Sequence, residues 1–567
     1  MNPDQLTTQA LLNCLIREVS APEEQVLEDD GHLLVRLARS GAVLRVATRR
    51  PSAGLGPRLA GEAALRAGSG WDAVGWEQLA ELIAGELTLA TGVPNEEFAA
   101  QVRSSHAATT AILGARPGGP GTTGTDSDAR IARYVRSEQA LVAGHRFHPA
   151  PKARGGGAGD WLDFAPEAGA RFPLRFLAVR DDVLDAVGDA TALDRLGGPA
   201  APAGYHALPA HPWQLRLLET RPWLGRALGD GRLVDLGPGS RLVAPTSSVR
   251  TVYDPVADAF CKFSLNVRIT NCVRKNSWYE LAGSVALTRL LDPVLADLAA
   301  RFPGTRLLRE PGYRTVSLGQ TDAAEGLAVL VREGLRDHLA PGVTPVLAAA
   351  LAEPPTVAAA GPQAPGGLLD GRDGDWLLGW WEAYVRAVAP PALHALFSHG
   401  VILEPHLQNV LIGVDDRGHP VQAIFRDLEG VKLVAARHGA LLASLKPGVA
   451  SALAYDGERG WNRVAYCLIV NHLAEIAAAV ADRFPGAGGE FERALWDRLR
   501  AVLAGFARDH GGAPELRAVL AGVPLPAKAN LRLRWARGAD REAAYLAVRN
   551  PLGGRPALRA REVLAAC

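Results

Sequence analysis

The spacing of apolar and polar residues predicts both strands and helices near the start of the chain. Residues 33–50 alternate between apolar and polar positions around Ser40-Gly41, a pattern typical of a β-hairpin. Residues 76–92 instead place apolar side chains at helical spacing and end at Gly92, which favours a helix with a glycine cap. We therefore predict helices around short strands in this part of the chain.

Two tracts rich in Gly, Pro, Ser and Thr divide the pattern, at residues 115–129 and 352–367. Such composition cannot build a packed element and indicates linkers. A chain of 567 residues also exceeds what one hydrophobic core usually supports. We predict an α+β fold in three parts: a helical N-terminal region (1–115), a central α+β lobe (130–351), and a C-terminal lobe (368–567) that joins a small sheet to a helical bundle.

Composition narrows the class of protein. Hydrophobic residues make up 48% and charged residues 21%, as in ordinary soluble proteins, and the formal net charge is +1. This balance argues against a broad nucleic-acid or anionic-membrane surface. We find no secretory signal and no uncharged run long enough to span a bilayer, so we expect a cytoplasmic protein. The five cysteines include no Cys-x-x-Cys pair, which argues against a disulfide framework or a zinc site.

Four segments concentrate polar groups where the pattern predicts turns and strand ends, which is where function is usually found. The first, residues 138–157, places His145, His148, Lys152 and Arg154 in a loop punctuated by Gly and Pro. Several cations beside a flexible glycine run can surround a phosphate or carboxylate. The alternative is a solvated loop that happens to be basic.

The second segment, residues 245–251, contains Ser247, Ser248 and Arg250 in the run PTSSVRT. Hydroxyl groups followed by an arginine can donate hydrogen bonds to a polyphosphate. The segment lacks the glycines and lysine of a P-loop, so it is not one. An ordinary Ser/Thr turn is the alternative interpretation.

The third segment, residues 262–276, has the alternation of a strand with one apolar and one polar face. The polar face would carry Lys262, Ser264, Asn266, Arg268 and Thr270, and Asn271, Arg274 and Lys275 follow it. This face contains no acidic residue, whereas a solvent-exposed strand usually mixes both charges. We predict that it faces an anion, with simple solvent exposure as the alternative.

The fourth segment, residues 403–430, brings acids and amides together around a predicted hairpin. Glu404, His406 and Asn409 precede one strand, and Asp427 and Glu429 follow the returning strand. Carboxylate and amide oxygens are the ligands that Mg²⁺ prefers, and Mg²⁺ bridges nucleotide phosphates. His406 stands beside these acids in a His-x-x-Asn unit, which favours a functional over a structural histidine.

As a set, these segments resemble the IucA/IucC family of NRPS-independent siderophore synthetases. The resemblance runs from about residue 130 to 550 and rests on the runs GHRFHPAPKARGG, HPWQ, PTSSVRT, KFSLNVRITNCVRKN, EPHLQNVLI and FRDLEG. It implies a multi-lobed cupped hand of thumb, fingers and palm, with a palm distantly like that of kinases. It also implies ATP, Mg²⁺, and adenylation of a citrate- or succinyl-type acid. An amine, hydroxylamine or alcohol would then capture the adenylate and release AMP, and members of the family are commonly homodimers.

The resemblance also implies roles for individual residues. Arg274, His406 and Lys262 are the expected catalytic residues. The expected ATP-binding residues are Ser247, Ser248, Arg250, Asn271, Lys152 and His148. The expected metal ligands are Asn409, Asp427, Glu404 and Glu429.

Two other functions fit parts of the same pattern. His-x-x-Asn followed by Asp427 is similar to the catalytic segment of small-molecule kinases. A kinase, however, needs an aspartate base two residues after that histidine, where this chain has Gln408. A homologue that binds ATP or a siderophore without turnover is the second alternative.

Overall fold

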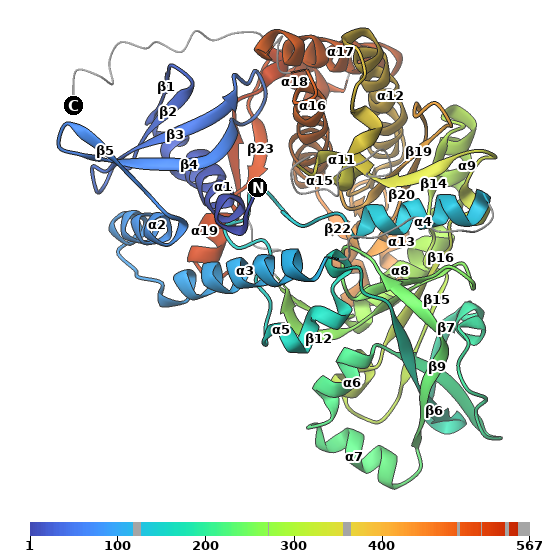
Figure 1. Ribbon diagram of the computed structural model, residues 1–567. Coiled ribbons are helices and arrows are strands. Elements are labelled where there is room, and N and C mark those ends of the chain that lie inside the picture. Colours follow the sequence, from blue (N-terminus) through green and yellow to red (C-terminus); the bar gives the residue numbers. More distant parts are fainter. Residues whose placement is uncertain are drawn as a thin grey trace.

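The computed structural model describes residues 1–116, 126–269, 272–354, 365–484, 488–511, 513–538 and 544–553. Helices and sheets pack in three adjoining lobes, with the N-terminal lobe to one side of the other two (Figure 1). The prediction of a mixed helix and sheet fold is confirmed. Asn271, a predicted ATP-binding residue, lies outside the described residues.

The N-terminal lobe is an antiparallel sheet of five sequential strands packed on helices. The strands are β1 (Val26–Asp29), β2 (His32–Arg36), β3 (Val43–Arg50), β4 (Arg58–Ala67) and β5 (Gly70–Ala73). The helices are α1 (Pro3–Leu15), α2 (Trp76–Thr91) and α3 (Glu96–Ala115). The predicted hairpin is confirmed as β2–β3, and the predicted helix as α2, which Gly92 caps at φ 72°. Leu531 and Trp535 from helix α19 (Asn530–Trp535), far along the chain, complete this core.

The central lobe is built on a curled sheet of eight strands. Their order across the sheet is β7-β15-β16-β11-β10-β9-β6-β8. The bounds are β6 (Phe172–Arg180), β7 (Leu184–Gly188), β8 (Tyr205–Ala210), β9 (Leu233–Pro245), β10 (Thr251–Asp254), β11 (Ala259–Phe263), β15 (Gly312–Val316) and β16 (Val329–Glu333). The long strands β6 and β9 pair with two register shifts, which bend the sheet.

The predicted single strand from residue 262 is wrong in one respect, because it divides at Ser264. β11 stays in the large sheet, while β12 (Leu265–Ile269) pairs with β13 (Cys272–Arg274). The Ser264 hydroxyl makes two hydrogen bonds at this break: it donates to the Glu325 carbonyl at 2.6 Å and accepts from the Asn276 N–H at 2.8 Å. The apolar alternation itself is correct, since Phe263, Leu265 and Val267 are buried.

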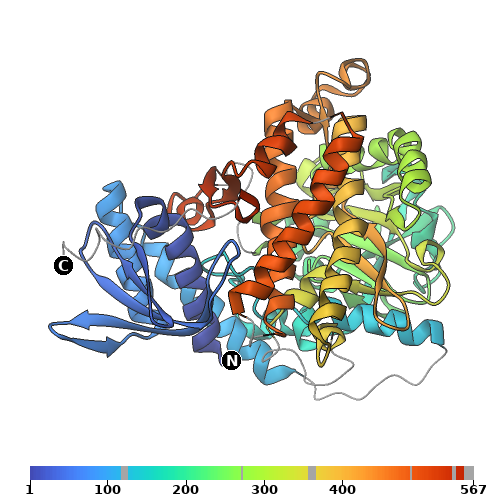
Figure 2. The ribbon, with the colours of Figure 1, turned by 90° about the horizontal axis from the view of Figure 1, so that it is seen from above.

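The C-terminal lobe joins a four-stranded sheet to long helices. The sheet has the order β14-β20-β19-β17, with bounds β14 (Thr305–Leu307), β17 (Thr344–Leu347), β19 (Val410–Val414) and β20 (Pro420–Phe425). The predicted hairpin is confirmed as β19–β20. Helices α12 (Gly374–His399) and α17 (Gly488–Asp509) run side by side, as Figure 2 shows.

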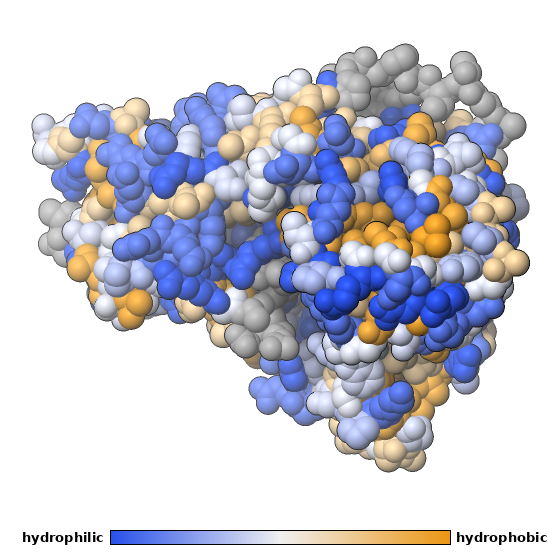
Figure 3. All heavy atoms as spheres, turned by 90° about the horizontal axis from the view of Figure 1, so that it is seen from below, coloured by the Kyte–Doolittle hydropathy of each residue, from blue (hydrophilic) through white to orange (hydrophobic). Residues whose placement is uncertain are grey.

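One continuous helical run, Gly457–Ala481, is long and apolar enough to cross a membrane, but 89% of its most apolar window is buried in the protein. It consists of α15 (Gly457–Val464), a π-helix η10 (Ala465–Leu473) and α16 (Ala474–Ala481). Its burial is that of a core helix of the C-terminal lobe. Seen from below, the surface is mainly hydrophilic, and its apolar groups gather on the half away from the N-terminal lobe (Figure 3).

Candidate active site

A cavity of about 350 Å³ lies where segments from all three lobes meet. Nine of the candidate residues named from the sequence line it: His145, His148, Lys152, Arg154, Ser247, Ser248, Arg274, Glu404 and His406. A charged cluster lies beside the cavity. Five other predicted residues form or flank this cluster and do not line the cavity: Lys262, Arg250, Asn409, Asp427 and Glu429. The two are continuous, because Ser248 and Arg250 share one turn and Glu404 packs against Gly430.

The charged cluster is centred on Lys262. Its ammonium lies 2.5 Å from Asp427 and 2.6 Å from Glu429, although its side chain is only 3% exposed. Arg250 binds Glu429 at 2.8 Å, and Arg332 binds Asp427 at 3.0 Å. The acid-free face predicted around Lys262 therefore meets acids, which come from the returning end of the β19–β20 hairpin.

These acids remain ionised. Burial raises the pKa of each carboxyl, but the neighbouring cations together outweigh it: Lys262 and Arg332 at Asp427, and Lys262 and Arg250 at Glu429. The pKa of Glu429 falls to about 2, and that of Asp427 falls well below its usual range. Both side chains keep about a quarter of their surface exposed. Ionised, accessible carboxylate oxygens are a donor set that suits Mg²⁺.

Asn409 and Asp427 flank the same end of the hairpin. Val410 pairs with Phe425 across the two strands, and the Arg426 N–H donates to the Asn409 carbonyl at 3.0 Å. Asp427 has φ 81°, a left-handed conformation that a non-glycine residue adopts at an energetic cost. Such strain is typical of functional sites. Glu404, which lines the cavity, is bound by Arg463 at 2.9 Å.

The Ser247–Ser248 turn is supported from beneath. Buried Glu138 accepts the Ser247 N–H at 2.9 Å and is itself held by Arg426 at 2.5 Å. Val249 in this turn has φ 66°, which is rare for a β-branched residue. Gln408 donates from its side chain to the Ser247 hydroxyl at 3.2 Å. The turn is therefore tied to the His406 segment and is more than an ordinary surface turn.

His406 is half-buried, and its Nδ1 accepts the Gln408 N–H at 3.2 Å. Burial lowers its pKa, although Glu404 and Asp427 oppose the effect. Behind it, Nδ1 of buried His472 donates to the Pro405 carbonyl at 2.8 Å, and the Tyr384 hydroxyl lies 2.5 Å from the other His472 nitrogen. The turn that carries His406 is thus fixed by a neutral histidine, because burial lowers the pKa of His472 to about 4.

The basic loop at residues 138–157 is largely neutralised within the protein. Buried Glu167 binds both Lys152, at 2.5 Å, and Arg154, at 2.9 Å. Burial, followed by the neighbouring His148 and Arg17, lowers the pKa of His145 to about 3. Lys152 therefore lines the cavity as part of an ion pair, and His145 lines it as a neutral imidazole.

Several cavity residues were not predicted as site residues. They are Arg17, Arg146, Glu353, Tyr466, Asn471, Glu475 and Asn530. Glu475 stands as a single charge in an apolar helical run, whereas Arg17 is followed directly by Glu18 in another such run. A charge in such a place needs a partner when it is buried. Arg17 lies in π-helix η1 (Ile16–Ser20) and Asn471 in η10, and π-helices are frequent at functional sites.

Comparison with known proteins identifies the family of this chain. Residues 133–353 match the profile of the "IucA / IucC family", and residues 379–543 match that of the "Ferric iron reductase FhuF-like transporter". An L-2,3-diaminopropanoate–citrate ligase from Staphylococcus aureus is 31% identical over 67% of this chain and 67% of its own. The chain belongs to the IucA/IucC family.

Other members extend the likeness to nearly the whole chain. The rhizobactin siderophore biosynthesis protein RhbC of Rhizobium meliloti is 29% identical over 97% of this chain and 98% of its own. The ATP-bound aerobactin synthetase IucA of Klebsiella pneumoniae superposes with a TM-score of 0.83 at 25% identity, covering 97% of this chain and 99% of that one. The predicted family and the predicted class, a ligase of siderophore biosynthesis, are confirmed.

Proposed function

We propose that this protein is an ATP-dependent siderophore synthetase that joins citrate to an amine through a citryl-adenylate. The observation that carries the proposal is the placement of the Ser247–Ser248 turn, Arg274 and His406 around one cavity, next to the Lys262 cluster. Citrate as the acid is supported by the relatives, whose names include citrate ligases for diaminopropanoate and for spermidine. An ATP-bound structural neighbour supports ATP.

The charge of the cavity suits a polyanionic acid. Six Arg or Lys side chains line it against four Glu side chains. Burial raises the pKa of one of these acids, Glu353, to about 7, so part of its negative charge is lost near neutrality. An excess of cations in a partly desolvated space attracts carboxylates more strongly than the same groups would in water.

In the proposed reaction, a citrate carboxylate oxygen attacks the α-phosphorus of ATP and pyrophosphate leaves. The amine then attacks the acyl carbon, the amide C–N bond forms, and AMP leaves with the oxygen that citrate supplied. Arg274 and His406 hold the reacting carboxylate, and neutral His406 can accept a proton from the amine. Ser247, Ser248, Arg250 and Lys262 bind the phosphates and offset the repulsion between two anions.

Asp427, Asn409 and Glu429 would hold Mg²⁺, which neutralises phosphate charge when bound. Glu404 is the weaker candidate for a ligand, because its side chain is only 15% exposed, against 27% for Asp427 and 26% for Glu429. The cupped-hand and kinase-like descriptions, the homodimer and the cytoplasmic location stay predictions.

The test is ATP turnover with a panel of acids (citrate, succinate, 2-oxoglutarate, N-succinyl-N-hydroxydiamines) and a panel of amines, with AMP resolved from ADP. Citrate-dependent AMP together with a citryl amide is the expected result. ADP with a phosphorylated acceptor would establish the kinase alternative, and ATP binding without turnover would establish the inactive homologue. AMP that depends on a different acid would keep the ligase and replace its substrate.

A further inference from the structure

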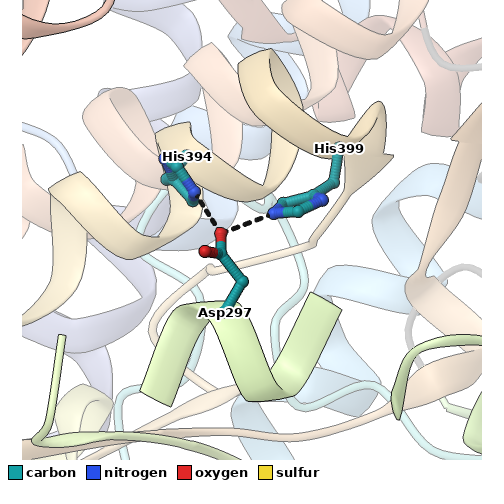
Figure 4. A group of neighbouring side chains, drawn as sticks. All are labelled: Asp297, His394 and His399. Carbon is teal, nitrogen blue, oxygen red and sulfur yellow. Dashed lines mark hydrogen bonds and ion pairs between the residues drawn. The ribbon is translucent and has the colours of Figure 1, made fainter. Parts of the chain in front are cut away.

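A second polar cluster lies away from the cavity, between helix α9 (Asp292–Arg301) and the C-terminal end of α12. Asp297 projects from α9, and His394 and His399 project from α12, so that the three side chains converge (Figure 4). One donor atom from each lies within 4.8 Å of those of the other two. None of the three lines the cavity, and the proposed reaction does not use them.

Both histidines face the same carboxylate oxygen. Asp297 Oδ2 lies 2.7 Å from His394 Nε2 and 2.8 Å from His399 Nε2. The other carboxylate oxygen, Oδ1, accepts from Arg301 at 2.9 Å. The carboxylate of Asp297 thus lies between two ring nitrogens, and Arg301 orients it from the other side. Carboxylates that bind a metal are oriented by hydrogen bonds in the same way.

Further polar groups pack behind His394. His510 Nε2 lies 2.8 Å from His394 Nδ1, and the Ser398 hydroxyl lies 3.0 Å from the same nitrogen. His510 Nδ1 in turn lies 3.1 Å from the Phe506 carbonyl. Both ring nitrogens of His394 therefore have polar neighbours, and its Nε2 is held facing Asp297. Such a second layer of hydrogen-bonding groups orients a histidine that binds a metal.

The surroundings of the cluster suit a metal ion. His394 is buried, with 3% of its side chain exposed, whereas Asp297 and His399 are 30% and 26% exposed, which gives solvent access on one side. His399 is the last residue of α12, where the helix dipole favours positive charge. Zn²⁺ at its usual bond lengths separates its ligand atoms by roughly 3.3 Å, so the partly exposed side chains need move apart by only about half an ångström.

We propose that Asp297, His394 and His399 form a zinc site with water as the remaining ligand. Two imidazoles and one carboxylate are typical Zn²⁺ ligands, whereas Mg²⁺ prefers oxygen alone. The scattered cysteines argued against a zinc site, but this one uses no cysteine. Bound metal would tie α9 to the end of α12, only five residues before Glu404, and would steady the approach to the His406 turn without touching substrate.

The test is calorimetric titration of the full-length, chelator-stripped protein with Zn²⁺, in excess Mg²⁺ to occupy oxygen-only sites. Wild type is expected to bind one Zn²⁺ tightly and to show a higher Tm with it. Asp297→Asn and His399→Gln should each weaken this binding by more than about 100-fold, beyond the 10–100-fold typical of a supporting residue. His510→Gln should weaken it within that range. Both ligand variants change partly exposed side chains, so their metal-free Tm should stay close to that of wild type.

The control is His206→Ala, which removes an exposed histidine that lies 3.2 Å from Asp181. Among the residues that the structure describes, this pair does not belong to a group of three possible metal ligands. It should leave Zn²⁺ binding unchanged. Equal Zn²⁺ affinity in wild type and His399→Gln would overturn the proposal. So would an absence of tight binding in wild type, which would mean that an extra proton satisfies the network.

Discussion

The two halves of the site balance their charges in different ways. Around Lys262, cations and carboxylates are paired at 2.5–3.0 Å, and the acids stay ionised. Around the cavity, basic side chains exceed acidic ones, His145 is neutral, and Glu353 is partly protonated. The first arrangement suits the exchange of internal ion pairs for phosphate and metal. The second suits an incoming acid that brings its own negative charge.

The largest expected effect comes from removing the centre of the charged half. Lys262→Met should lower activity by more than about 10³-fold, since phosphate and transition-state charge lose a buried cation. It should also lower the free energy of unfolding by about 3 kcal/mol, at the low end for a broken buried pair because the carboxylates are partly exposed. Activity assays and urea denaturation check both.

The double variant Lys262→Met/Glu429→Gln separates these effects. Removing one of the two carboxylates that Lys262 neutralised restores the charge balance of the cluster, so it should restore part of the stability and none of the activity. Recovery of activity in the double variant would contradict a role for Lys262 in catalysis.

On the cavity side, Arg274→Ala and His406→Ala should each reduce kcat/KM by about 10²–10³-fold while the protein folds normally. Each loses a contact to the reacting carboxylate, and neither is part of the ion-pair cluster around Lys262. The matched control is Arg268→Ala, an exposed arginine on the neighbouring strand β12, which should retain wild-type activity. Wild-type turnover in Arg274→Ala or His406→Ala would remove these residues from the site.

Glu353 makes the cavity half sensitive to pH. Burial raises its pKa from 4.5 to about 7, so the folded protein keeps this proton in a range where the unfolded chain has lost it. The stability that this carboxyl contributes is therefore present below pH 4.5 and is lost as the pH rises through about 7. Glu353→Gln should be more stable than wild type by about 3 kcal/mol at pH 8, with a much smaller difference at pH 5.

Denaturation of both proteins at the two pH values measures this difference. The exposed Glu458→Gln serves as the control and should show no pH-dependent gain. A gain for Glu353→Gln that is the same at pH 5 and pH 8 would mean that the carboxyl of Glu353 titrates normally.

The smallest effect is expected where the two halves join. Gln408→Ala loses the 3.2 Å hydrogen bond to the Ser247 hydroxyl, and a neutral hydrogen bond contributes about 1 kcal/mol. We expect the KM for ATP to rise about fivefold with little change in kcat. A loss of kcat by 100-fold or more would instead make Gln408 a catalytic residue and would reopen the comparison with kinases.

The sequence predicted those parts of the site that lie in polar turns or at the end of a strand. His145, Ser247, Arg274 and His406 stand in runs whose composition indicates binding, and the structure brings them to one cavity. The pairing of Lys262 with Asp427 was not predictable, because it joins residues 165 positions apart. Arg17 and Asn471 were not predicted, because the apolar residues around them have the spacing of an ordinary helix. In the structure both lie in π-helices, and both line the cavity.

The most direct test of the central claim is oxygen transfer. The protein is incubated with ATP, an amine substrate and citrate labelled with ¹⁸O in its carboxylates, and the products are examined by mass spectrometry. If citrate attacks the α-phosphorus, AMP carries one ¹⁸O atom and pyrophosphate carries none. Appearance of ¹⁸O in inorganic phosphate, with ADP as the nucleotide product, would contradict adenylation and show attack on the γ-phosphorus instead.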